Sequence, residues 1–256
     1  MNLTADFHTH TIYSHGKGTV LQNAIQAQSK GLKQVGITDH GFAHSVFGLS
    51  KKKIPQLITD CKNATEQTGV KVLVGVEANL TSTAGDVDLK PKLYDNFDIF
   101  LAGIHKMIIF KAGSWFRFGI PNLIYSTFNA KNAPKSLVKR TTNAVVQAIK
   151  KNPIDVVTHL NFCSYLDPVE VAKVASDYGT YIELNSKKVH LSDEDLFKVY
   201  NTGVRFVIDS DAHTPDRVGE ISLIEETLKR TNFPLDRIDN IDGKLPTFRF
   251  KAFKER

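Results

Sequence analysis

The chain has 256 residues, of which 41% are hydrophobic and 23% are charged, with a formal net charge of +6. These proportions are ordinary for a folded globular protein and argue against a disordered chain. No shift in composition divides the sequence, so residues 1–256 are predicted to form a single domain. The positive charge suits an anionic substrate and is also compatible with nucleic acid.

Targeting and redox signals are absent from the sequence. The amino-terminal residues lack a basic region followed by an apolar core, and no apolar run approaches the ~20 residues of a membrane span. We therefore expect a cytoplasmic protein with no membrane partner. Cys61 and Cys163 lack Cys-x-x-Cys spacing and predict neither a disulfide framework nor a thiolate zinc site.

Strand-like and helix-like segments alternate along the chain, which is typical of a parallel α/β architecture. Strands are predicted at 3–10, 34–39, 70–76, 98–104, 155–158, 180–184 and 205–208. Helices are predicted at about 20–30, 50–68, 136–151, 168–178, 192–201 and 216–230, with Thr19 and Ser192 as N-caps.

The first strand carries two histidines. With a period of two residues, His8 and His10 share one face and Phe7 and Thr9 the other. Such an imidazole pair can share one metal ion. A single His-x-His is more commonly a packed or solvent-facing pair, so the prediction depends on similar residues at the later strands.

Nine ionisable side chains lie at predicted strand ends or in the following loops, on the face where parallel barrels place their active sites. They are His8, His10, His15, His40, Glu77, His105, His159, Asp211 and His213, which leaves His44 and His190 as apparent bystanders. Burying so many polar groups is costly unless cations satisfy them. Imidazole and carboxylate ligands without thiolate favour Zn, Mn or Fe over Mg or Ca.

Six short motifs contain most of these residues. They are His8-x-His10, Thr38-Asp39-His40-Gly41, Gly75-Val76-Glu77-Ala78, Gly103-Ile104-His105, Thr158-His159 and Ser210-Asp211-Ala212-His213. Together they resemble the PHP (polymerase and histidinol phosphatase) family, in its stand-alone phosphoesterase branch. The resemblance implies a distorted (β/α)7 barrel with a metal site at the C-terminal face of its parallel strands. It also implies three divalent ions, with zinc preferred and manganese or iron as alternatives, and hydrolysis of phosphate esters.

The resemblance also implies a ligand set for each ion. His8, His10, Glu77 and Asp211 would bind the first, Glu77, His105 and His159 the second, and His15, His40 and His213 the third. Glu77 would bridge two ions. His15 follows His10 by five positions, whereas the family pattern has about six in a loop of variable length, so His15 has the weakest support.

Such a cluster predicts hydrolysis by a water or hydroxide shared between ions, while the remaining charge neutralises phosphoryl oxygens. Asp39 and Asp211 are the candidate catalytic carboxylates. Asp39 would either orient an imidazole or donate a proton. Asp209 faces the same choice, and a structural role is favoured.

An aromatic insertion follows His105 at about 106–135. We expect a lid over the metals, with Lys106, Arg117 or both contacting the phosphate. A packed hairpin or an oligomer contact explains the insertion equally well. Arg217 is a further candidate phosphate ligand.

The leading hypothesis is a phosphomonoesterase for a small phosphorylated metabolite, of which histidinol phosphate is one example. A phosphodiesterase or exonuclease acting on nucleic acid is the alternative, although the sequence shows no clear basic stripe. A non-catalytic metal-binding protein ranks last, because the ligand set is complete.

Overall fold

The structure is a computed structural model that describes residues 1–128 and 133–255. Its strands are β1 (Ala5–Thr9), β2 (Gln34–Ile37), β3 (Lys71–Asn79), β4 (Ile99–Gly103), β5 (Val156–Val157), β6 (Tyr181–Asn185) and β7 (Phe206–Asp209). Its α-helices are α1 (Val20–Ser29), α2 (Ile54–Thr68), α3 (Ile120–Phe128), α4 (Lys135–Lys151), α5 (Pro168–Tyr178), α6 (Asp193–Tyr200), α7 (Ser222–Thr231) and α8 (Arg249–Lys254).

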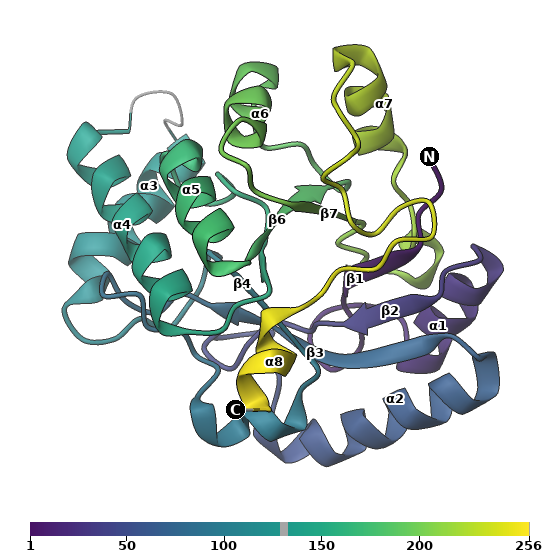
Figure 1. Ribbon diagram of the computed structural model, residues 1–256. Coiled ribbons are helices and arrows are strands. Elements are labelled where there is room, and N and C mark those ends of the chain that lie inside the picture. The colour runs from purple at the N-terminus through teal and green to yellow at the C-terminus, as the bar shows by residue number, and fades with distance from the viewer. Residues whose placement is uncertain (129–132, 256) are drawn as a thin grey trace.

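The seven strands form one parallel sheet in chain order, and each strand pairs with the next. Most of the helices surround this sheet (Figure 1). A bridge between Thr9 and Ala212 brings the first and last strands together, and the His10 N–H donates to the Ala212 carbonyl at 2.8 Å. The sheet is thus a nearly closed barrel, which confirms the predicted fold class.

Strand β1 is irregular, and this irregularity determines which side chains enter the barrel. Its register against β2 shifts between Asp6 and Thr9. As a result Phe7 packs in the barrel interior, while the His8 and His10 side chains converge just above it. A regular period of two would have placed Phe7 and His8 on opposite faces.

Alternate residues of the strands build two apolar cores. The larger core lies between the strands and the surrounding helices and includes Val35, Val72 and Val76. The smaller core fills the barrel interior with residues from six of the seven strands, which are Ala5, Phe7, Leu73, Ile99, Leu101, Val156, Tyr181 and Val207. Polar residues later in these strands, such as Glu77 and Glu183, occupy the next interior layer.

The carboxy-terminal segment closes the end of the barrel where the strands begin. The Phe248 ring lies edge-on to the Phe7 ring at 4.9 Å and to the Tyr181 ring at 5.9 Å. Helix α8 follows, drawn in yellow in Figure 1, and its Phe250 N–H donates to the buried Asp155 carboxylate at 2.8 Å. The sequence analysis did not predict this helix.

Two predicted segments differ from the structure. The helix expected at 216–230 begins at Ser222, because Gly219 has a left-handed backbone (φ 72°) and its N–H donates to Asp6 at 2.8 Å. The 106–135 insertion is helical over much of its length, with a π-helical turn at Trp115–Gly119 leading into α3. Residues 129–132 of that predicted segment lie outside the described residues.

Several local predictions hold. Thr19 caps α1 in a capping box with Gln22, Ser192 caps α6, and Gly69 ends α2 in a left-handed conformation. Cys61 and Cys163 are free thiols.

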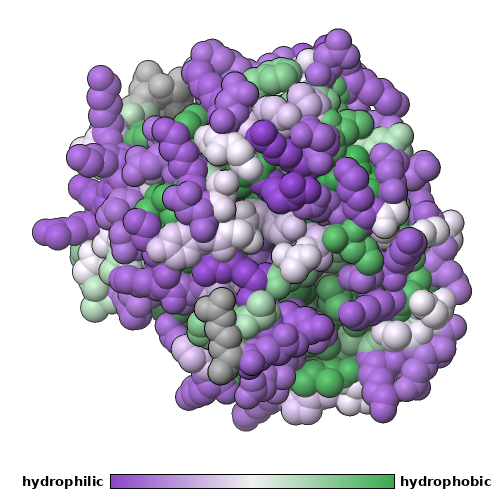
Figure 2. Space-filling model, in the orientation of Figure 1, coloured by the Kyte–Doolittle hydropathy of each residue, from purple (hydrophilic) through white to green (hydrophobic). Residues whose placement is uncertain are grey.

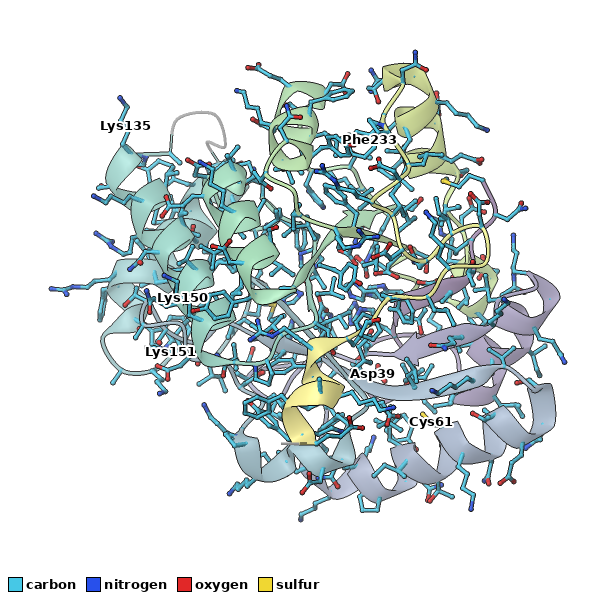
Figure 3. All side chains as sticks on the ribbon, in the orientation of Figure 1. Asp39, Cys61, Lys135, Lys150, Lys151 and Phe233 are labelled. Atoms are coloured by element: carbon cyan, nitrogen blue, oxygen red, sulfur yellow. The ribbon has the colours of Figure 1, made fainter. Side chains whose placement is uncertain are left out.

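The surface drawn in Figure 2 is mostly hydrophilic, with scattered apolar patches. In Figure 3, Lys135 of α4 projects away from the barrel, and Cys61 of α2 lies on the side of the molecule that α2 covers. No helix in the described parts of the chain is long and apolar enough to cross a membrane.

Candidate metal centre

Glu77 lies at the centre of the polar cluster at the C-terminal end of the barrel. It sits inside β3, two residues before the strand ends, and its side chain is fully buried. Its Oε1 lies 2.8 Å from His159 Nε2 and 3.0 Å from His105 Nε2. Its Oε2 lies 3.0 Å from His40 Nδ1, 3.3 Å from His8 Nε2 and 3.7 Å from His10 Nε2.

One carboxylate therefore faces five imidazoles, which come from the ends of four strands. Around it are four groups of three residues each. Within each group, the three ligand atoms lie within 4.8 Å of one another. The groups are His8, His10 and Asp211; His8, Glu77 and His159; His40, Glu77 and His105; and His10, His40 and His213. Since they share members, they form one continuous cage, called the metal cage below.

The chemistry of the cage fits divalent cations. Glu77 Oε2 is buried and accepts no hydrogen bond in the described structure, although three imidazole nitrogens surround it. Burial opposes ionisation of Glu77, but His105 and His8 outweigh it, so the Glu77 pKa lies well below its usual value. Burial also opposes ionisation of Asp211, yet His8 and His10 hold its pKa well below the usual range. Ionised carboxylates beside buried imidazoles are typical ligands of zinc and similar ions.

Hydrogen bonds behind the cage orient its imidazoles. Glu183 of β6 contacts His8 Nδ1 through Oε1 at 2.6 Å, and its Oε2 accepts from the His159 N–H at 2.6 Å. Asn79 Oδ1 contacts His105 Nδ1 at 2.8 Å. Because a carboxylate or an amide oxygen can only accept, His8 and His105 each carry the proton on Nδ1 and turn the Nε2 lone pair toward the cage.

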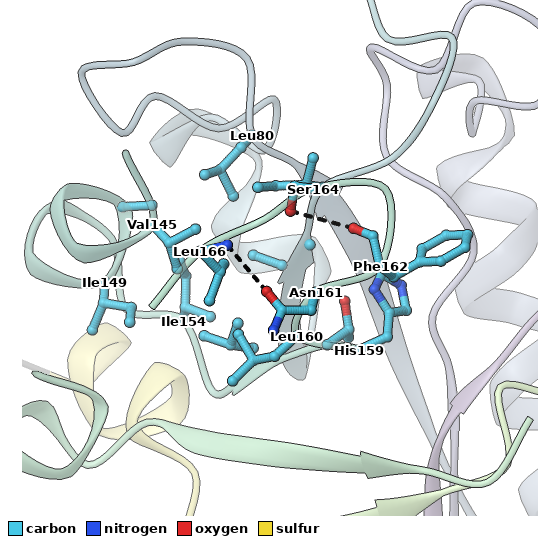
Figure 4. A pocket seen from close by; sticks show the side chains of 16 residues that line it. Leu80, Val145, Ile149, Ile154, His159, Leu160, Asn161, Phe162, Ser164 and Leu166 are labelled. Atoms are coloured by element: carbon cyan, nitrogen blue, oxygen red, sulfur yellow. Dashed lines mark hydrogen bonds between the residues drawn. The ribbon is translucent and has the colours of Figure 1, made fainter. Parts of the chain in front are cut away.

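The loop after β5 positions His159. His159, Asn161 and Cys163 have positive φ angles of 28°, 68° and 55°. The loop is held by a hydrogen bond from the Leu166 N–H to Asn161 Oδ1 and another from the Ser164 hydroxyl to the Phe162 carbonyl (Figure 4). Such backbone strain, about 1–3 kcal/mol per residue, persists where the surrounding structure enforces it and is concentrated at functional sites. Asp211, which follows β7, also has a positive φ, of 49°.

The predicted ligands are all at or beside the cage, but His15 differs from the other eight. Its ring stacks on His40 at 4.8 Å and lies 4.2 Å from His213, yet it belongs to none of the four groups. The prediction grouped His15 with His40 and His213, whereas in the structure His10 forms a group with these two histidines.

The candidate catalytic carboxylates have different surroundings. Asp211 is part of the cage. Asp39 lies behind it and accepts hydrogen bonds from the Thr11 N–H at 2.8 Å, the Thr11 hydroxyl at 2.6 Å and the Ser14 hydroxyl. It therefore holds the loop that leads to His15. Asp209 accepts from the Phe7 N–H at 2.6 Å, and burial holds its pKa well above the usual value.

The cage opens into a pocket of about 190 Å³, called the metal pocket below. Lys106 lines it, whereas Arg117 and Arg217 are exposed side chains outside its described lining. Lys187 also lines it, with Nζ 3.4 Å from Asp211 Oδ1 and 3.1 Å from His213 Nδ1. His44, predicted to be a bystander, lines it too and stacks on His40 at 5.2 Å.

The sequence analysis singled out neither Lys187 nor the orienting role of Glu183. Glu183 was visible only as a polar residue in a strand, and Lys187 belongs to a loop. The sequence did offer one signal for Glu183: it is a carboxylate near the end of a predicted strand, next to a predicted metal site.

The amino-acid sequence matches the PHP domain family over residues 6–233. Among curated proteins, a probable phosphatase of Thermoanaerobacter sp. is 29% identical, with 97% of this chain and 95% of the relative covered. A probable phosphatase of Acetivibrio thermocellus is 28% identical, with 100% and 98% covered.

Among solved structures, histidinol phosphate phosphatase from Lactococcus lactis, complexed with zinc, L-histidinol and phosphate, has a TM-score of 0.61 at 15% identity. The comparison covers 96% of this chain and 97% of that one and supports the shared fold. The family match spans nearly all of the barrel and every residue of the cage, and the chain belongs to the PHP domain family.

Proposed function

We propose that the protein is a metal-dependent phosphatase that hydrolyses the phosphate monoester of a small metabolite. The observation that supports this most directly is the position of Glu77, whose two oxygens face different sets of imidazoles. One carboxylate can thus bridge neighbouring cations. The names of the curated relatives and the phosphate bound by the Lactococcus lactis protein support a phosphate ester as the substrate.

Divalent ions held here, three in the proposal and zinc by preference, would act as Lewis acids and supply the nucleophile for in-line phosphoryl transfer. The protein's part is to hold and orient them. Glu77 and Asp211 provide the negative charge, and the imidazoles complete the ligand sets. Glu183 keeps the His8 proton on Nδ1, away from the ions.

Two lysines are positioned to bind the phosphate. Lys187 and Lys106 both line the metal pocket, and an ammonium group there can donate to phosphoryl oxygens. Lys187 already lies beside Asp211 and His213, so it would meet a phosphate held over those ligands. We therefore assign phosphate binding to Lys187 in addition to the predicted Lys106.

Hydrolysis assays on the purified, zinc-loaded protein test the proposal. The substrates are p-nitrophenyl phosphate, bis(p-nitrophenyl) phosphate and single-stranded DNA. We expect activity on the monoester, with loss on chelation. His8→Ala should lower kcat/KM by more than about a hundredfold. His190→Ala is the matched control, because His190 belongs to none of the four ligand groups.

The outcomes separate the alternatives. Preference for the diester or for DNA would support the nucleic-acid hypothesis. Retention of full activity by a metal-free protein, or by His8→Ala, would contradict the proposal.

A further inference from the structure

A second cavity, of about 330 Å³, lies beside the metal pocket, and we call it the apolar chamber. It forms between the segment 104–110, which follows β4, and the turn and helix at 115–123. The side chains of Met107, Ile109, Phe110, Trp115 and Leu123 account for much of its lining. Its volume is at the lower end of the roughly 300–1,000 Å³ typical of small-molecule sites.

The chamber and the metal pocket are contiguous. His105, Lys106, Met107 and Cys163 line both of them. His105 is also a member of the metal cage, with Nε2 at 3.0 Å from Glu77 Oε1. A phosphate monoester could therefore have its phosphate at the cage while the rest of the molecule extends past His105 into the chamber.

The chamber offers no carboxylate to a cationic group, and its polar lining in the described structure is limited to Ser45, His105, Lys106, Asn122 and Cys163. None of its lining residues that the structure describes is an Asp or a Glu. Burial raises the pKa of the Cys163 thiol to about 11, so it is neutral. The Asn122 amide nitrogen donates to the Phe118 carbonyl at 3.0 Å and lies 3.1 Å from the Thr141 hydroxyl, which is also 3.3 Å from Asn122 Oδ1, so both polar atoms of the amide are partnered.

Several apolar side chains at the chamber are exposed to solvent. Ile109 is 59% exposed, Leu123 45% and Trp115 41%. Large apolar side chains that cluster on a surface next to a polar site are typical of a binding surface. A ligand that covered them would gain free energy from removing apolar area from water, while a cation placed there would lose hydration and find no carboxylate.

We propose that the apolar chamber binds the alcohol part of the substrate, and that this part is an uncharged alkyl or aryl group. The inference rests on the phosphatase function proposed above and narrows its substrate class. It disfavours amino alcohol phosphates, including histidinol phosphate, because their ammonium group would have no acidic partner in the chamber.

Two isosteric substrates test the proposal. Propyl phosphate and 2-aminoethyl phosphate differ by a methyl group in place of an ammonium group. We expect kcat/KM for propyl phosphate to be at least about tenfold higher. Along the series from methyl to butyl phosphate, kcat/KM should rise about fourfold for each added methylene.

Leu123→Glu places a carboxylate in the chamber and should lower the propyl-to-aminoethyl ratio at least about tenfold. The matched control is Leu223→Glu on α7, which introduces the same charge at a side chain of similar exposure that is outside the described lining of the chamber. It should leave the ratio unchanged. Ile109→Glu serves as a second variant, should Leu123→Glu fail to fold.

Binding provides a readout that does not depend on turnover. Trp115 is the only tryptophan in the chain and lines the chamber. Butylphosphonate added to the zinc-loaded protein should shift its emission, whereas methylphosphonate at saturation should not.

The failures of the two proposals are distinguishable. Hydrolysis of none of these monoesters would contradict the phosphatase function itself. Hydrolysis of propyl and aminoethyl phosphates with equal kcat/KM, or a ratio unaffected by both chamber variants, would overturn the chamber proposal and leave the phosphatase function standing.

Discussion

Replacing Glu183 with Gln should weaken metal binding without removing any metal ligand. Glu183 is buried and accepts three contacts, from His8 Nδ1 at 2.6 Å, the His159 N–H at 2.6 Å and Asn185 Nδ2 at 3.0 Å. A Gln side chain has one oxygen and one NH₂ group, so it cannot accept at both ends.

The two orientations of that amide have different costs. If the NH₂ group faces the His159 N–H and Asn185, it leaves two buried donors without acceptors, at about 1–3 kcal/mol each. If it faces His8, Nδ1 must accept, and the His8 proton moves to Nε2, where it blocks the lone pair that faces the cage. The second orientation costs less, so we expect Glu183→Gln to favour it.

The loss should be about 10–100-fold in metal affinity, or about 1.4–2.7 kcal/mol. Competition between the protein and a chromophoric zinc chelator measures it. Glu194→Gln, at an exposed side chain of α6, is the matched control and should bind zinc as the unmodified chain does. A folded Glu183→Gln protein with unchanged zinc affinity would refute the reasoning about the His8 tautomer.

Three further predictions concern other parts of the site and the fold. His40→Ala should reduce the zinc bound per chain by about one ion, whereas His15→Ala should reduce it less, as measured by elemental analysis after dialysis; an equal loss in both would make His15 a full ligand. Asp39→Asn should lower the free energy of unfolding by about 1–3 kcal/mol, since one of its oxygens becomes a donor facing the Thr11 N–H or hydroxyl; urea denaturation checks this. Burial raises the pKa of Asp155 from 3.8 to about 7, so between these values the folded chain holds a proton that the unfolded chain has lost, and stability falls as the pH rises. Asp155→Asn should remove this slope, shrinking the loss of stability between pH 5 and pH 8 by roughly 2–3 kcal/mol in urea denaturation; an unchanged slope would assign the dependence to other groups.

Local patterns in the sequence were sufficient for the seven-stranded architecture. Apolar runs of strand length alternate with capped, amphipathic helices, and a parallel sheet follows because each connection is long enough to cross over. The same patterns placed nine candidate ligands at the strand ends, where parallel strands bring distant residues to one face.

The tertiary structure decided what those side chains contact. The register shift in β1, the carboxylate of Glu183 behind His8, and the approach of Lys187 to Asp211 depend on contacts between residues far apart in the chain. Local periodicity contains no information on such contacts. Likewise, the aromatic residues after His105 were compatible with a lid, a packed hairpin or an oligomer contact, and only the packing of this segment as a π-helical turn and α3 created a chamber beside the metal pocket. The chemistry of the ligands follows from residue type, whereas the shape of the substrate site follows from packing.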